Sequence, residues 1–173
     1  MMKRVSFTAF FCLAFTFSVS AQSTFHSAFL SSYNQATGKV LQLADAFSQD
    51  QLAWRPAEGI RSVSEAMMHV ASANFFFSSM LGAEVPEGIN PQELESSVTN
   101  KAEVARILKM SVEHARKAIE KTSAEALDDE VDLFGNESTN MGLILLIGDH
   151  ANEHLGQLIA YARSTGVVPP WSN

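Results

Sequence analysis

Apolar residues recur at steps of three and four over most of this chain, and four segments show the pattern clearly. This spacing places the apolar side chains on one face of an α-helix. The alternation typical of a strand is not sustained over any segment bounded by turn residues. The pattern therefore predicts an all-α protein, a four-helix bundle with one shared core. The first helix is expected over residues 24–48, with an apolar stripe formed by Phe25, Phe29, Tyr33, Ala36, Val40, Leu43 and Phe47.

Capping residues mark where the second and third helices begin. Ser62 is followed three residues later by Glu65, which is the capping box that starts many helices. Asn100 and Glu103 form a similar pair at the start of the third helix, which should end near residue 122.

The fourth helix should run from about residue 139 to residue 165. It should lie deepest in the bundle, because residues 143–147 are almost all apolar. Gly166 suits the left-handed stop of a helix, and the prolines that follow prevent continuation. Turn residues and acidic clusters predict the loops between helices, which are expected at residues 54–59, 84–91 and 128–136.

The first 21 residues have the pattern of a secretory signal peptide. Two basic residues precede a Phe-rich apolar run, residues 5–19, and small residues ending at Ala21 form the site that a signal peptidase reads. An uncleaved membrane anchor is the alternative, but the run is shorter than the roughly 20 apolar residues that span a bilayer. We therefore expect cleavage after Ala21, a mature domain of residues 22–173, and a periplasmic or extracellular location.

The expected mature chain is acidic. It has 10 Lys and Arg residues against 19 Asp and Glu residues, a net charge of −9, because the signal segment contains two basic residues and no acidic ones. This charge argues against nucleic acid as a partner and against stable membrane association after cleavage. The only cysteine, Cys12, lies in the signal segment, so the mature domain has no disulfide and no cysteine ligand for a metal.

His150 and His154 are the first candidates for chemistry. Because they are four residues apart on a helix, their rings lie one turn apart on the same face. That face is otherwise apolar, so both rings should point into the bundle, where each needs a partner. A divalent metal ion would satisfy both, since neutral imidazole is a good ligand and this spacing lets two rings converge. For the pair alone, two ordinary core histidines are the alternative.

His69 adds a third inward histidine, from the second helix. Three protein ligands with an open fourth position are typical of a catalytic or exchangeable metal site. We therefore expect a divalent metal ion between His69, His150 and His154. No general base is evident, so the catalytic residues stay unassigned.

The other polar candidates are weaker. His26 and His114 do not lie on an inward stripe, so both are expected at the surface. Four residues near the histidines have expected supporting roles: Asp149 to orient a ring, Gln157 to line the pocket, Glu65 as a candidate base, and Glu153 as a solvated surface charge.

Several short motifs follow one another in order from the end of the first helix to the terminal prolines. They are Trp54-Arg55-Pro56-Ala57-Glu58-Gly59, Arg61-Ser62, His69, His150-Ala151-Asn152-Glu153-His154-Leu155-Gly156-Gln157-Leu158 and Gly166-Val167-Val168-Pro169-Pro170. Together they resemble the DinB/YfiT-like family. The resemblance implies an up-up-down-down four-helix bundle, often a homodimer. It also implies a metal centre at the positions of His69, His150 and His154, with zinc or nickel as the metal.

The resemblance implies two kinds of activity, thiol-dependent transfer and metal-dependent hydrolysis. Low-molecular-weight thiols are mainly cytosolic reductants, so an exported protein would rarely meet them in reduced form. We therefore expect an exported metal-dependent hydrolase that acts on a small molecule. Non-catalytic binding of a metal or ligand is the alternative, and a thiol-dependent S-transferase is less favoured.

Overall fold

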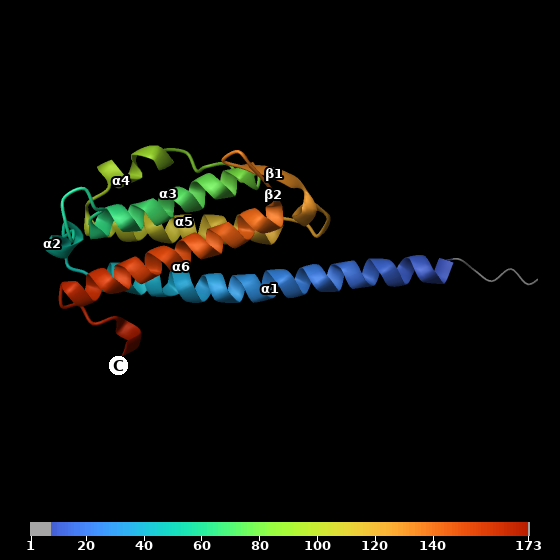
Figure 1. Cartoon of the computed structure of the whole chain (residues 1–173), viewed down its shortest axis with the longest axis horizontal. Helices are drawn as coiled ribbons and strands as arrows, with labels where there is room; N and C mark the ends of the chain where they lie inside the picture. Colours follow the sequence, from blue (N-terminus) through green and yellow to red (C-terminus); the bar gives the residue numbers. More distant parts are fainter. Residues whose placement is uncertain (1–7, 173) are drawn as a thin grey trace, which may run out of the picture.

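The computed structural model describes the backbone of residues 8–172 and the side chains of residues 24–172. Four long helices pack against one another, which confirms the predicted bundle (Figure 1). The long helices are α1 (Thr8–Ala46), α3 (Val63–Met80), α5 (Lys101–Lys121) and α6 (Asn140–Ser164). The shorter elements are α2 (Gln49–Leu52), α4 (Leu94–Ser97), the 3-10 turns η1 (Pro91–Glu93), η2 (Glu125–Asp128) and η3 (Pro170–Ser172), and the strands β1 (Glu130–Leu133) and β2 (Asn136–Thr139).

The expected signal peptide, residues 1–21, lies outside the residues whose side chains the structure describes. α1 begins at Thr8, upstream of the start expected near residue 24. Within the described part of the chain, no helix is both long enough and apolar enough to cross a membrane. Cleavage after Ala21 therefore stays a prediction.

Side-chain bonds fix the starts of α3 and α5. Ser62 accepts from the backbone amide of Glu65 (3.3 Å), and the Glu65 carboxylate accepts from the amide of Ser62 (2.6 Å), which confirms the capping box. Asn100 caps α5 as expected. Glu103, however, pairs with Arg106 (2.7 Å) instead of completing a box. The guanidinium offers two parallel hydrogen bonds, which is a stronger interaction than one bond to a backbone amide.

α1 and α6 run in one direction, and α3 and α5 run in the other (Figure 1). His26 in α1 bonds to the carbonyl of Ile119 near the end of α5 (3.0 Å). Tyr161 near the end of α6 bonds to the carbonyl of Arg61, just before α3 (3.1 Å). The order along the chain is therefore up-down-down-up, which differs from the up-up-down-down order implied by the family resemblance.

The crossover segment, residues 81–100, accounts for this order. It leaves the end of α3 and returns along that helix to the start of α5, carrying α4 against α3 (Figure 1). Residues 47–62 and 122–139 instead form compact units, α2 with its turn and the β1–β2 hairpin. Helices joined by such units run antiparallel, whereas the crossover segment leaves α3 and α5 parallel.

Two short elements depart from the expected loops. Ser48 caps α2 through a capping box with Gln51. β1 and β2 pair antiparallel within and beside residues 128–136, where only an exposed loop was expected. Strands of four residues are too short to show a sustained alternation. Even so, Val131 and Leu133 alternate with exposed residues and pack against the apolar core beside α6.

A buried polar triad links three helices within the bundle. The Tyr33 hydroxyl on α1 donates to Oδ1 of Asn74 on α3 (3.1 Å), and Nδ2 of Asn74 donates to Oγ of Ser111 on α5 (3.2 Å). All three side chains are buried, and the amide of Asn74 depends on Tyr33 and Ser111 for its hydrogen bonds, whereas the Ser111 hydroxyl also donates to the carbonyl of Leu108 (2.8 Å). Burial raises the pKa of the Tyr33 hydroxyl, which therefore stays protonated as a donor. Because the bonds are directional, the triad fixes the register of α1, α3 and α5.

Replacing Tyr33 by Phe should lower the free energy of unfolding by about 1–2 kcal/mol, because the buried Asn74 oxygen loses its donor while the ring is kept. Denaturant titration followed by circular dichroism measures this change. Asn34→Ala, at the next and exposed position of α1, is the matched control and should cost no more than about 0.5 kcal/mol. A Tyr33→Phe protein as stable as the parent would contradict a structural role for the triad.

Candidate metal centre

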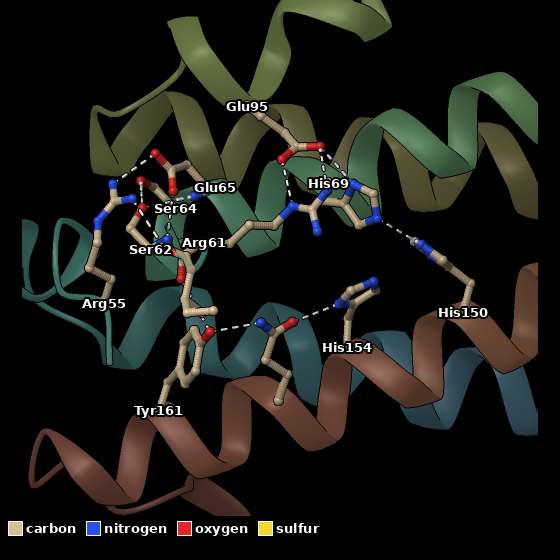
Figure 2. Close-up of polar contacts among 12 residues, drawn as sticks. Arg55, Arg61, Ser62, Ser64, Glu65, His69, Glu95, His150, His154 and Tyr161 are labelled. Atoms are coloured by element: carbon tan, nitrogen blue, oxygen red, sulfur yellow. Dashed lines mark hydrogen bonds and ion pairs between the residues drawn. The ribbon is translucent and has the colours of Figure 1, made fainter. Parts of the chain in front are cut away.

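Three imidazole rings converge between α3 and α6 (Figure 2). His69 extends from α3, and His150 and His154 extend from successive turns of α6. Their ring centroids are between 4.4 and 5.0 Å apart. The Nε2 atoms of His69 and His150 are 3.2 Å apart, and the nitrogens offered by the three rings all lie within 4.8 Å of one another. The structure therefore brings together the three residues selected from the sequence.

Glu95 on α4 fixes the ring of His69 (Figure 2). Nδ1 of His69 donates to Oε1 of Glu95 (2.6 Å), and Nε of Arg61 donates to the other carboxylate oxygen (2.6 Å). Burial raises the pKa of the Glu95 carboxyl, but the bonds from Arg61 and His69 outweigh this effect and leave the pKa below its ordinary value. The carboxylate is charged and can only accept. Nδ1 of His69 therefore carries a proton, and Nε2 faces the other histidines, with its lone pair available when the ring is neutral.

Glu95 was not selected from the sequence. It is 26 residues from His69 and is one of several acidic residues in the crossover segment, with no local pattern that distinguishes it. Only the return of this segment along α3 brings the carboxylate to the ring.

A chain of hydrogen bonds fixes the ring of His154. Tyr161 donates its hydroxyl to the backbone carbonyl of Arg61 (3.1 Å), so the hydroxyl oxygen accepts from Nε2 of Gln157 (2.7 Å). The amide of Gln157 therefore turns Oε1 toward Nδ1 of His154, which donates to it (2.7 Å). Because Nδ1 of His154 carries the proton, its Nε2 is left with a lone pair. Gln157 is thus a polar residue of the site, as expected.

Arg61 joins the two sets of contacts. Its guanidinium binds Glu95, and its backbone carbonyl accepts from Tyr161. The next residue, Ser62, starts α3 through the capping box. The start of α3 therefore positions the groups that orient both His69 and His154.

The two α6 histidines are uncharged at neutral pH. Burial, together with the nearby His154 and His69, lowers the pKa of His150 to about 4. Burial also lowers the pKa of His154, although its bond to Gln157 opposes this shift. Neutral imidazole is the form that binds a metal ion.

The cluster fits a divalent metal ion. Two nitrogens bound to one tetrahedral ion at 2.0–2.1 Å lie roughly 3.3 Å apart, and the Nε2 atoms of His69 and His150 are 3.2 Å apart. Histidine ligands commonly donate their other ring nitrogen to a carboxylate or carbonyl oxygen. His69 and His154 both do so here. Three imidazoles suit several divalent metals, and they leave room for a further ligand.

The other carboxylates considered from the sequence lie elsewhere. Glu65 accepts from the backbone of Ser62 and pairs with Arg55 (2.9 Å), contacts that lower its pKa and hold it at the helix start. Asp149 is exposed and lines a separate groove between α1 and α6, so its expected role in orienting a ring is wrong. Glu95 and Gln157 take that role. Glu153 is exposed, as expected.

His26 and His114 do not join the cluster, but both rings are half-buried, so their expected surface positions are wrong. His26 bonds to the carbonyl of Ile119. His114 packs against the ring of Phe75 (5.3 Å between centroids), and burial lowers its pKa. The packing of α1 on α5 and of α3 on α5 covers these rings, and neither contact is visible in a local pattern.

Both the sequence and the fold are similar to those of known proteins. A sequence model of the DinB superfamily matches residues 32–158, which include all three histidines. The uncharacterized protein YjoA of Bacillus subtilis (strain 168) is 29% identical over 130 residues, which are 72% of this chain and 80% of that protein.

Solved structures of DinB-like proteins have a similar fold. A DinB-like protein from Bacillus cereus ATCC 10987 superimposes with a TM-score of 0.72 at 19% identity, over 83% of this chain and 95% of that chain. The DinB-like protein YjoA from Bacillus subtilis superimposes with a TM-score of 0.65 at 26% identity, over 82% of this chain and 93% of that chain. The family match covers most of the sequence and the structural matches cover most of the fold, so this chain belongs to the DinB superfamily.

Proposed function

We propose that this chain binds one divalent metal ion through His69, His150 and His154 and acts as a metal-dependent hydrolase. The convergence of three imidazoles, two of them with Nδ1 already engaged, is the observation that carries the proposal. A bound divalent ion would supply a Lewis acid that polarises a carbonyl or phosphoryl oxygen of a small-molecule substrate. Zinc or nickel is the proposed metal, as the family resemblance implies.

The residues around the histidines keep the site ready to bind. Glu95 and Gln157 each hold the Nδ1 proton of one ring, so the Nε2 lone pairs of His69 and His154 point inward without a rearrangement. Contacts of this kind typically change metal affinity by about 10–100-fold. Arg61 supports both contacts and keeps Glu95 charged.

Non-catalytic binding of a metal or ligand is the second candidate function, and one observation favours it. Hydrolysis commonly uses a general base. Among the described residues, the carboxylates considered for this role are engaged or turned to solvent: Glu95 holds His69 and Arg61, Glu65 caps α3, and Glu153 is exposed. A thiol-dependent S-transferase is less favoured, because the proposed export removes the chain from the compartment of reduced thiols.

Metal-loaded protein should hydrolyse at least one substrate in a panel of amides, esters and phosphoesters, and His150→Ala should abolish both metal binding and this activity. The metal content of protein purified without a His tag is measured by plasma mass spectrometry, and rates by chromogenic assays. His26→Gln changes a histidine outside the cluster and should keep the metal. If the parent protein binds metal but hydrolyses no substrate faster than His150→Ala does, non-catalytic binding is favoured. A parent protein that binds neither zinc nor nickel when titrated with them would overturn the proposal.

Glu95→Gln should weaken zinc binding by about 10–100-fold, because the charged acceptor that fixes His69 is lost. The stability of the metal-free protein should change by less than about 1 kcal/mol, since the ion pairs of Glu95 are partly exposed. Competition with a chromogenic chelator measures the zinc affinity, and thermal melting checks the fold. Glu93→Gln, an exposed carboxylate on the adjoining η1 turn, is the matched control. Equal zinc affinity in both variants would show that His69 does not depend on Glu95.

Export is part of the same proposal and rests on residues 1–21. Protein isolated from the expressing cell should begin at Gln22, because the small residues ending at Ala21 form the expected cleavage site. N-terminal sequencing measures this directly, and a chain that begins at Met1 would contradict export by cleavage. The homodimer implied by the family resemblance also stays a prediction, for which light scattering of the purified protein is the measurement.

A further inference from the structure

Three phenylalanines form a continuous aromatic surface beside the metal centre. We call Phe76, Phe77 and Phe134 the aromatic shelf. Phe77 contacts the ring of His150 edge to face, with centroids 6.1 Å apart, and its other neighbours are Phe76 at 5.5 Å and Phe134 at 6.4 Å. Phe76 and Phe134 stack on each other at 6.1 Å. The aromatic shelf therefore extends without a break from a proposed metal ligand to the tip of the hairpin.

Two of these rings are unusually open to solvent for phenylalanine. Phe134 is 72% exposed and Phe76 is 45% exposed, whereas Phe77 is only 7% exposed and belongs to the core. Phe76 follows His69 by seven residues on α3, so the two side chains share a face of that helix about 10 Å apart along its axis. A ligand bound at the histidines and extended along α3 would meet the exposed rings.

The backbone at Phe134 has a conformation that a phenylalanine does not favour. Phe134 and Gly135 link β1 to β2, and both have positive φ, 59° and 86°. A two-residue hairpin with positive φ at both positions favours Asn, Asp or Gly, because a side chain with a bulky Cβ substituent is strained there. Residues in such conformations concentrate at functional sites. Here the strained residue projects its ring onto Phe76 (Figure 1 shows the hairpin beside the end of α3).

The metal centre therefore has a polar end and an apolar end. Arg61 lies just before the start of α3, and Phe76 lies about two turns after His69 on that helix. Gln157 and Tyr161 on α6 lie on the Arg61 side. A ligand that places a polar group between the histidines would therefore meet apolar side chains only in the direction of Phe76.

We propose that the aromatic shelf binds an aromatic or bulky apolar group of the ligand whose polar end occupies the metal centre. This inference rests on the proposed metal site and names the class of molecule that the site takes, a metal-coordinating head joined to an apolar tail. A second copy of this chain is a weaker occupant. Two phenylalanine side chains bury at most about 150–250 Å² of surface each, whereas a stable interface buries roughly 800 Å² of surface on each partner.

Two hydroxamates separate the metal centre from the aromatic shelf. Acetohydroxamate can reach only the metal, and 3-phenylpropionohydroxamate adds a phenyl group on a short linker. Zinc-loaded protein should bind the phenyl compound more tightly, and Phe134→Asn or Phe76→Ala should reduce this preference by about three- to tenfold, as expected for loss of one aromatic contact. Affinity for acetohydroxamate should be unchanged. Titration calorimetry measures both compounds. Asn suits the turn at position 134, so that variant removes the ring while favouring the hairpin.

The control is Leu145→Ala, which removes an exposed apolar side chain of α6 away from the aromatic shelf and should leave both affinities at parent values. Binding of acetohydroxamate with no preference for the phenyl compound would overturn this inference and leave the proposed metal site intact. Failure of the zinc-titrated protein to bind zinc or acetohydroxamate would overturn both. The Phe134→Asn protein could also keep the parent's preference for the phenyl compound while losing a dimer that light scattering detects in the parent. That result would assign the aromatic shelf to self-association and also overturn the inference.

Discussion

The hydrogen bond between His69 and Glu95 is the contact on which the site depends most. It joins α3 to the crossover segment, and it determines which nitrogen of His69 carries the proton. Arg61 holds the same carboxylate in place, so the bond does not depend on one flexible side chain alone. The crossover segment thus has two consequences: it leaves α3 and α5 parallel, and it supplies the charged group that turns Nε2 of His69 toward α6.

α3 contributes residues to the metal centre, to the aromatic shelf and to the buried polar triad. Its capping box starts the helix immediately after Arg61, its middle carries His69, and its last turns carry Phe76 and Phe77 of the aromatic shelf. Asn74 faces the other way, into the buried triad with Tyr33 and Ser111. Because the triad fixes the register of α1, α3 and α5, it also fixes where His69 lies along the bundle. A site built on a packed helix is held more rigidly than one built on loops.

α6 supplies the complementary half by simpler means. Its two histidines are one turn apart, and its close packing on α1 leaves no space beside Gly148, where an added Cβ would lie 2.8 Å from the ring of Phe29. Burial of this helix lowers the pKa of both histidines and so favours the neutral form. The same burial would be costly for two imidazoles without partners. Gln157 satisfies one ring, and the approach of His69 to His150 satisfies the other.

The sequence by itself determined the four long helices and the inward faces that carry His69, His150 and His154, because these features depend on spacing within single helices. The 3.6-residue period places His150 and His154 on one face, and the capping residues at Ser62 and Asn100 are local signals. The tertiary structure alone decided the direction order of the helices, the role of Glu95 and the burial of His26 and His114. Each of these depends on which distant segments meet, and a local pattern carries no information about that. The hairpin lies between the two cases, since β1 shows alternation over only four residues and β2 shows none.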